Sequence, residues 1–465
     1  MDDGRSAGDR AGAEVRSEMH ARLKRRLSRL LLASAAVCAI AGLAAAQEPD
    51  AALLAKIEAI RAIDNHAHTP AFTKPGEKDD GYDALPCEPL EPTDPTLTSR
   101  EYNPAYLEAW KKLFGYRYDD RAPEHVRELL AAKERIRREQ GEKYPAWVLD
   151  RLGIETELAN RVAMGRGLTP PRFRWVPFDD ALLFPLNNSA LAATTPDRAI
   201  FFAREGALLA EYVKAQGKST PPAMLDEYLA QIVTPTLESQ RKAGAVAVKF
   251  EAAYLRALDF EPAEKPRAAE IFARWIGRGA PPANEYKTLE DFLFRYVAAE
   301  AGRLGMAVHV HTGYGCGGYF QLAGANPLLL ESVLDDPALR KTKFVLLHGG
   351  AGPYTKAVAE LLMKPNVYTD FSEQTWLVPT RELSRVLRYW LEWYPEKVLF
   401  GTDLSPGTPE IGWEEIGWQT TQSARRALAI ALTGMMNDGE ITRPQAEHIA
   451  EMVLRRNAAK LYGWN

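Results

Sequence analysis

The sequence predicts an α/β fold of the (β/α)8 TIM barrel class, with long helical insertions after the first and third strands. Short apolar, β-rich runs that end in polar residues or glycine alternate along the chain with helical patterns. Strands that alternate with helices pair in parallel, and eight such units close into a barrel. The eight predicted strands are residues 59–66, 157–162, 172–177, 245–250, 306–311, 343–348, 366–371 and 397–402.

The segments between these strands predict helices, and two of them are unusually long. Residues 289–304 are typical of the ordinary connections, with apolar side chains recurring on one helical face. Residues 69–156 and 179–244 are the long insertions, and both contain further helical patterns. Connections that follow barrel strands emerge at the active face, so we expect the insertions to form a lid or pocket wall. The alternative is a helical decoration without a role in substrate binding.

The first 46 residues have the pattern of a signal peptide. A basic stretch that includes Arg25 and Arg26 precedes the apolar residues 30–46, which end in three alanines before Gln47. Cleavage after Ala46 would leave one barrel domain, residues 47–465, exported to the periplasm or secreted, with no stable membrane insertion. An uncleaved membrane anchor is the alternative.

Composition excludes some partners and leaves other features open. Lys and Arg (58) nearly balance Asp and Glu (62), and no basic stripe stands out, so we expect no nucleic-acid partner. Removal of the signal peptide leaves only Cys87 and Cys316, too few for a disulfide framework, and whether they pair stays open. A homo-oligomer is also left open.

Histidines gather at the predicted strand ends, where barrel enzymes carry their catalytic groups. Residues i and i+2 of a strand point to the same side, so His66 and His68 can present two imidazoles to one metal ion. Hydrogen-bonded core histidines would have no reason to concentrate at these ends. The remaining members of the set are His309 and His311 on the fifth strand, His348 on the sixth and Asp403 after the eighth.

The fourth strand adds candidate substrate-binding residues. Lys249, Glu251 and Tyr254 leave this strand toward the same face. Lys249 is expected to pair with a substrate carboxylate, to be carboxylated and bridge two metal ions, or to form a salt bridge. His309 lies one step deeper in its strand, in the core layer or supporting the site, and is counted with Lys249 and Tyr254 as a candidate substrate-binding residue.

The order of these motifs resembles the amidohydrolase superfamily, in particular its amidohydrolase-related branch, from about residue 57 to the end. That branch includes hydrolases, decarboxylases and hydrolase-like domains fused to glutamine synthetases. The matching pieces are Asp64-Asn65-His66-Ala67-His68, Val248-Lys249-Phe250, His309-Val310-His311-Thr312-Gly313, Leu346-Leu347-His348-Gly349-Gly350, Tyr368-Thr369-Asp370-Phe371-Ser372, Phe400-Gly401-Thr402-Asp403 and Arg456-Asn457-Ala458-Ala459-Lys460-Leu461-Tyr462.

The resemblance implies a role for each strand-end residue. His66, His68 and His311 would ligate one divalent metal ion, with Asp403 as a further ligand or as the base, and His348 as the acid/base or electrostatic group facing the metal. Imidazoles and a carboxylate suit Zn²⁺, while Mn²⁺, Fe²⁺ or Ni²⁺ remain possible.

The function implied by the resemblance is that of an exported metal-dependent hydrolase acting on a small molecule. Water activated by the metal would attack an amide or ester carbonyl, with Asp403 as the base. The same site could instead serve a non-oxidative decarboxylase or a sugar-acid isomerase. A non-catalytic metal-binding module is the alternative of a different class.

Overall fold

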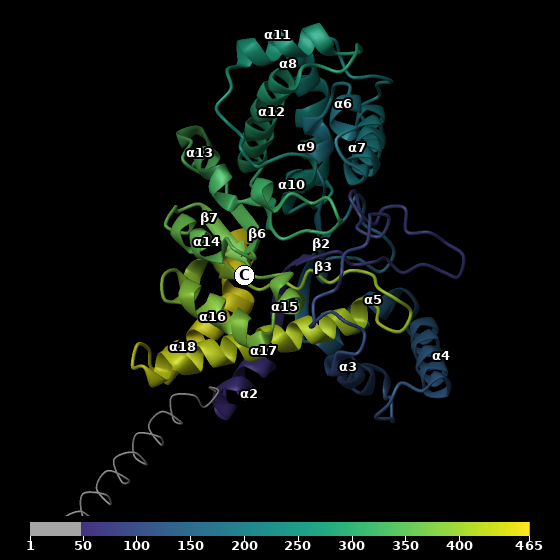
Figure 1. The fold of residues 1–465 in the computed structure, drawn as a ribbon, viewed down its shortest axis with the longest axis vertical. Helices are drawn as coiled ribbons and strands as arrows, with labels where there is room; N and C mark the ends of the chain where they lie inside the picture. Colours follow the sequence, from purple (N-terminus) through teal and green to yellow (C-terminus); the bar gives the residue numbers. More distant parts are fainter. Residues whose placement is uncertain (1–47, 465) are drawn as a thin grey trace, which may run out of the picture. The chain divides into compact units, whose positions relative to one another are not determined.

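Eight parallel strands form the centre of the fold in a computed structural model that describes residues 48–464 (Figure 1). The described residues from Pro49 onward form one compact unit. The predicted signal peptide, residues 1–46, lies outside the described residues. The strands are β1 (Ala62–Ala67), β2 (Ile154–Asn160), β3 (Phe173–Val176), β4 (Ala247–Phe250), β5 (Ala307–Gly313), β6 (Phe344–Ala351), β7 (Val367–Asp370) and β8 (Val398–Leu399).

The strands pair in sequence order, as the barrel prediction requires. Strands β1 to β3 form one parallel sheet and β4 to β8 another, and two isolated parallel bridges, one of them Trp175 to Ala245, join β3 to β4. On the other side, the backbone N–H of Asn65 donates to the Phe400 carbonyl at 2.9 Å, and that of Asp403 donates to the His66 carbonyl at 2.8 Å. Both seams are therefore bridged, and the predicted (β/α)8 barrel is confirmed.

Buried polar side chains reinforce the seam between β1 and β8. The Asp64 carboxylate accepts hydrogen bonds from the backbone N–H and the hydroxyl of Thr402, at 2.9 and 2.6 Å. Asp64 is fully buried, and burial raises its pKa well above the ordinary range. A buried carboxylate is costly unless hydrogen bonds satisfy it, so these bonds fix the end of β1 beside the residues that follow β8.

Helices surround the barrel, and the helices of the two insertions lie apart from each other (Figure 1). Helices α7 to α9 of the second insertion lie with α11 and α12 at one end of the unit, while α3 to α5 of the first insertion lie beside α17 at the other. The insertion helices are α3 (Pro104–Phe114), α4 (Pro123–Gln140), α5 (Tyr144–Leu152), α6 (Ser189–Ala192), α7 (Pro196–Ala215), α8 (Leu225–Tyr228) and α9 (Thr234–Lys242). The remaining helices are α2 (Ala51–Ala59), α10 (Ala252–Leu255), α11 (Lys265–Trp275), α12 (Ala283–Arg303), α13 (Glu331–Leu334), α14 (Thr355–Leu361), α15 (Gln374–Leu377), α16 (Thr380–Leu391), α17 (Trp413–Asn437), α18 (Arg443–Glu451) and α19 (Asn457–Tyr462).

Two of the insertion helices, α3 and α7, begin at side-chain caps. The Asn103 side chain accepts from the Ala105 N–H at 2.9 Å at the start of α3, and Thr195 accepts from the Arg198 N–H at 3.2 Å at the start of α7. A proline follows each capping residue. Side-chain capping satisfies backbone donors that the first helical turn leaves free, and proline is favoured there because its missing N–H is not needed.

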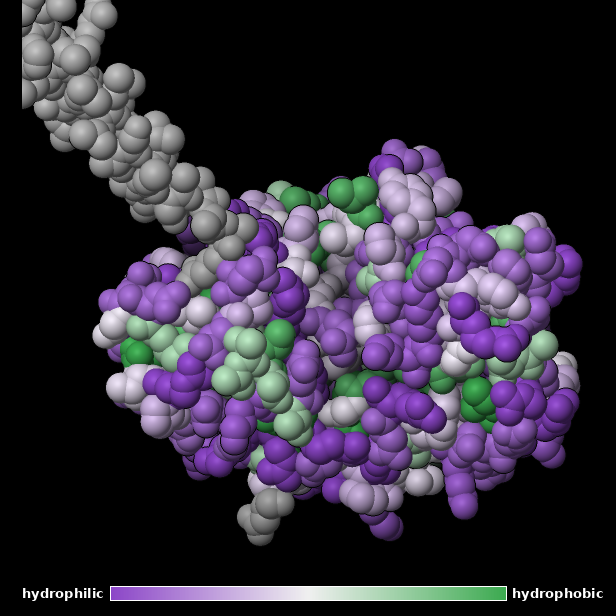
Figure 2. Space-filling view, turned by 90° about the horizontal axis from the view of Figure 1, so that it is seen from below, coloured by the Kyte–Doolittle hydropathy of each residue, from purple (hydrophilic) through white to green (hydrophobic). Residues whose placement is uncertain are grey.

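The surface of the unit is largely polar on the face drawn in Figure 2. Hydrophilic residues predominate there, and hydrophobic ones are scattered in small groups. Within residues 48–464, no helix combines the length and the apolar character needed to cross a membrane.

Candidate active site

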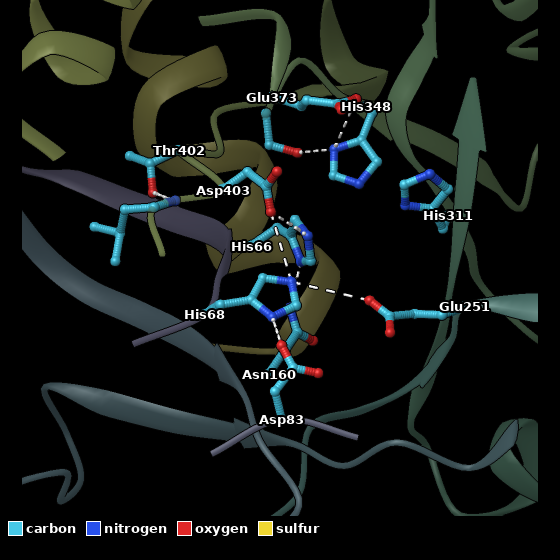
Figure 3. Close-up of polar contacts among 12 residues, drawn as sticks. His66, His68, Asp83, Asn160, Glu251, His311, His348, Glu373, Thr402 and Asp403 are labelled. Carbon is cyan, nitrogen blue, oxygen red and sulfur yellow. Dashed lines mark hydrogen bonds and ion pairs between the residues drawn. The ribbon is translucent and has the colours of Figure 1, made fainter. Parts of the chain in front are cut away.

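Three donor groups from different strand ends meet at the mouth of the barrel. Among the described residues, His66, His348 and Asp403 offer ligand atoms that all lie within 4.8 Å of one another. His66 Nε2 is 3.0 Å from Asp403 Oδ1 (Figure 3). Both imidazoles are buried and the carboxylate is 15% exposed, so the three groups share a largely enclosed space. This set of nitrogen and oxygen donors fits a divalent metal ion such as Zn²⁺.

His68 lies just beyond β1 and faces the same carboxylate. Its Nε2 atom is 3.6 Å from Asp403 Oδ1, and its Nδ1 atom is 2.5 Å from Asp83 Oδ2. Burial lowers the pKa of His68, but the carboxylates of Asp83, Asp403 and Glu251 outweigh it and raise the pKa to about 9. A carboxylate behind an imidazole orients the ring toward a metal ion. Asp83 is such a group, and it lies in an insertion where no sequence signal pointed to it.

His66 is held in a form that can bind a metal. Its Nδ1 atom contacts the Asn160 side chain, and its Nε2 atom is 3.5 Å from Lys249 Nζ. Burial, followed by the charge of Lys249, holds the pKa of His66 well below its usual range. The neutral imidazole that results is the form that ligates metal ions.

The hydrogen bonds of His348 define which of its ring nitrogens is free. The Ser372 hydroxyl donates to Asp370 Oδ1 at 2.6 Å, and Ser372 Oγ lies 2.9 Å from His348 Nδ1. A hydroxyl has one hydrogen, so its oxygen accepts from His348 Nδ1–H, and Nε2 keeps a free lone pair. Burial and the neighbouring His311 lower the pKa of His348 well below its usual range.

His311 approaches the same group from β5. Its Nε2–H donates to the Tyr314 carbonyl at 2.7 Å, which leaves Nδ1 as its potential ligand atom. Its ring centroid is 4.6 Å from that of His348. The structure thus brings together five of the six predicted strand-end groups, all except His309. The closest trio contains His348 in place of His68 and His311. Ligation by His68 and His311 stays a prediction.

The three predicted substrate-binding residues lie in different places. Tyr254 lines the cavity in front of the trio. Lys249 and His309 are fully buried and are not among the residues that line this cavity. Lys249 Nζ is 3.4 Å from Glu251 Oε1, and His309 Nε2 is 2.7 Å from the Tyr462 hydroxyl. Of the roles predicted for Lys249, the geometry shows the salt bridge.

The cavity has a volume of about 470 Å³, and two members of the trio, His348 and Asp403, line it. Residues of the first insertion between Tyr82 and Ser99 form much of its wall, as predicted, while the second insertion contributes no lining residue. Cys87 of the first insertion forms a disulfide with Cys316, which follows β5, and both cysteines line the cavity. A cavity of this size suits a small molecule.

Glu373 is a site residue that sequence reasoning missed. Among the described residues, three other than glycine have left-handed backbone angles: His348 (φ 62°), Glu373 (φ 60°) and Asp403 (φ 57°). All three line the cavity. Such a conformation costs about 1–3 kcal/mol and persists where the surrounding structure imposes it, commonly at functional sites. The motif found at the seventh strand, Tyr368 to Ser372, ends one residue before Glu373 and so did not include it.

The parallel barrel carries imidazoles and a carboxylate at the C-terminal ends of its strands, the position of the active site in barrel enzymes. Such donors suit a divalent metal ion. The sequence profile of the amidohydrolase family matches residues 192–464, more than half of the chain. The chain therefore belongs to the amidohydrolase family.

Other comparisons agree with this assignment. Protein fluG of Emericella nidulans is 30% identical over 232 residues, which are 47% of this chain and 26% of fluG, so the chain spans about a quarter of that relative. The uronate isomerase of Thermotoga maritima superposes with a TM-score of 0.52 at 13% identity, covering 88% of this chain and 96% of the isomerase. For the glucuronate isomerase of Caulobacter crescentus the TM-score is 0.51 at 12% identity, with coverage of 89% and 93%. At such identities the structures show a shared fold alone.

Proposed function

We propose that this protein is a metal-dependent hydrolase that cleaves an amide or ester bond of a small molecule. The observation that carries the proposal is the position of Asp403. Its carboxylate lies 3.0 Å from His66 Nε2 and 3.6 Å from His68 Nε2, at the floor of a cavity of small-molecule size. It is therefore next to the donors that would hold a metal ion and within reach of a water molecule there.

The donor set supports one divalent metal ion, and zinc is the ion that we propose. His66, His348 and Asp403 would hold it, with His68 and His311 as the further donors around it. When bound, such an ion polarises a carbonyl oxygen and lowers the pKa of water toward about 7.

The chain's own residues move the proton. Asp403 accepts the proton of the attacking water and passes it to the leaving group. Because the one free nitrogen of His348 would be used to hold the ion, Asp403 is the group left to move the proton. Asp83 and Ser372 act through the imidazoles of His68 and His348, which they hold in place.

The cavity wall favours hydrolysis over the two alternative reactions. Decarboxylases and sugar-acid isomerases act on carboxylates, and Lys or Arg side chains usually hold such groups. Among the residues that line this cavity in the described part of the chain there is no Lys and no Arg. We retain the isomerase and the decarboxylase as outcomes of the test.

We propose further that the protein is exported, to the periplasm or beyond the cell. The supports are the basic and apolar order of residues 22–46 and the disulfide between Cys87 and Cys316. Disulfides persist in oxidising compartments and are rare in the cytosol. N-terminal sequencing of the exported protein tests this proposal, since retention of residues 30–46 would contradict it.

The reaction is tested by assaying the purified, zinc-loaded protein on amides, esters, aromatic acids and uronates. Release of amine or alcohol from the first two groups, abolished by a chelator and restored by zinc, supports the proposal. Release of CO2 from the aromatic acids, or interconversion of uronates without hydrolysis, would overturn it in favour of the alternatives. Absence of turnover on every substrate would favour a binding module.

A further inference from the structure

The wall of the cavity carries an excess of negative charge. Six carboxylate side chains line it, and no Lys or Arg side chain does so within the described part of the chain. One of the six, Asp403, belongs to the trio that could share a metal ion, and the other five remain as acidic groups of the wall. The six are Asp83, Glu88, Asp94, Glu251, Glu373 and Asp403.

Three of these six carboxylates have a basic side chain close to them. Asp83 pairs with His68 at 2.5 Å, and Glu251 lies 3.4 Å from the ammonium group of Lys249. Asp403 faces His66 and the proposed metal ion. Glu88, Asp94 and Glu373 are left, and within residues 48–464 none of them forms an ion pair with a Lys or Arg side chain.

Glu373 differs from the other two because it is buried. Its side chain is 5% exposed, and its Oε2 atom has no hydrogen-bond partner. His348 Nδ1 lies 4.0 Å from Oε2 (Figure 3). That nitrogen already donates to Ser372 Oγ. Glu373 also stands outside the trio that could share a metal ion. Oε2 of Glu373 is therefore a buried acceptor without a hydrogen-bond partner, on a strained backbone at the cavity wall. A ligand that donates a hydrogen bond there would satisfy it.

We propose that the substrate carries a cationic nitrogen, an ammonium or guanidinium group, near its scissile carbonyl, and that Glu373 receives it. This inference rests on the proposed hydrolase function. Glu88 and Asp94 are exposed at the cavity wall and favour entry of a cation over an anion. The rings of Tyr254 and Trp376 also line the cavity and provide faces to which a cation is attracted.

The test measures binding of three hydroxamates of similar size to the zinc-loaded protein by calorimetry. Butyrohydroxamate is neutral, β-alanine hydroxamate carries an ammonium group and the monohydroxamate of succinic acid carries a carboxylate, while all three present the same metal-binding group. We expect the cationic compound to bind about tenfold more tightly than the neutral one. The anionic compound is expected to bind most weakly.

Two variants connect this preference to Glu373. Glu373→Gln retains the size of the side chain and removes its charge, so the tenfold advantage of the cationic compound is expected to vanish. Glu264→Gln removes an exposed carboxylate outside the cavity and is expected to retain the advantage. Thermal melting and metal analysis accompany both variants. If Glu373→Gln does not fold, the affinities of the unaltered protein for the three hydroxamates decide whether the site prefers a cation.

Equal affinities for the cationic and neutral compounds would overturn the inference. So would a loss of bound zinc in Glu373→Gln, because Glu373 would then serve the metal and not the substrate. Failure of the proposed function has a different outcome. If the protein prefers the cationic hydroxamate but hydrolyses neither neutral nor cationic amides and esters, only the hydrolase proposal is refuted. Hydrolysis of neutral substrates without a cationic preference would refute only the inference made here.

Discussion

Cys87 and Cys316 are joined in a disulfide that spans 229 residues of sequence and forms part of the cavity wall. It ties the first insertion to the loop after β5. A backbone hydrogen bond from Gly318 N–H to the Glu91 carbonyl, 3.2 Å long, joins the same two segments. The cavity therefore depends on a covalent link between segments that lie far apart in the chain.

We predict that the variant with both Cys87→Ser and Cys316→Ser is less stable and binds ligands more weakly. Loss of a disulfide that closes a long loop typically lowers the free energy of unfolding by about 2–5 kcal/mol. Denaturant unfolding measures this loss, and hydroxamate binding reports on the cavity. The unaltered protein after reduction serves as the control and should match the variant. Unchanged unfolding and binding in both would show that the remaining contacts hold the wall in place.

Asp403→Asn is predicted to lower kcat by about 10²–10⁴-fold while the fold and most of the bound metal are retained. Asparagine has nearly the same volume and an oxygen that can accept a hydrogen bond, but it cannot take up the proton of water. A rate assay, metal analysis and thermal melting of the variant decide this. Asp119→Asn, which changes a 91% exposed carboxylate, is the matched control. A rate near that of the unaltered protein would assign the base to another group.

The protein is predicted to hold one tightly bound metal ion per chain. Lys249 Nζ lies 3.5 Å from His66 Nε2 and 3.4 Å from Glu251 Oε1. We expect this ion pair with Glu251, and not the bridging carbamate of a two-metal site, to be the role of Lys249. Elemental analysis after dialysis measures the stoichiometry. Two tightly bound metal ions per chain, with activity that depends on bicarbonate, would contradict this prediction.

Removal of the ion by a chelator should also lower Tm, because a ligand that binds only the folded state stabilises it.

Arg256→Ala is predicted to be strongly destabilising although it lies outside the trio. Arg256 is 8% exposed and donates to Glu290 at 2.8 Å and to Asp291 at 2.7 Å. Its removal leaves the buried Glu290 without its ion pair, while Asp291 keeps Lys287 Nζ at 2.8 Å. Loss of one partner of a buried ion pair typically costs about 3–5 kcal/mol. Chemical denaturation measures the loss. Arg267→Ala, which removes an exposed ion pair with Glu270, should change stability little. Similar stabilities for the two variants would show that Arg256 is dispensable.

The barrel could be predicted because its signals are local. Each of the eight predicted strands overlaps an observed one, and boundaries differ by a few residues, as for 59–66 against Ala62–Ala67. The alternation of apolar runs with amphipathic helical patterns can be recognised from neighbouring residues in the sequence. It predicts the barrel because the apolar faces of these strands and helices are the faces that the fold buries. The strand-end histidines could be found for the same reason, since parallel strands place all their carboxyl ends at one face.

Other features of the site depend on contacts between distant residues. Asp83 supports His68 from an irregular part of an insertion, and no periodic pattern marks such a residue. The choice of ring nitrogen in His348 depends on a hydroxyl 24 residues away. Only the packed barrel shows that Lys249, a predicted substrate-binding residue, is fully buried, pairs with Glu251 and does not line the cavity.

The sequence by itself determined the fold class, the strands and the six groups at their ends, five of which meet at the site. These features could be predicted because periodicity and strand-end position depend on neighbouring residues in the chain. Tertiary structure alone decided that Cys87 bonds to Cys316, that the first insertion and not the second lines the cavity, and that Glu373 turns a carboxylate toward it. The physical reason is that these features arise where segments far apart in the chain are packed together, and the free energy of such packing cannot be assigned to either segment alone.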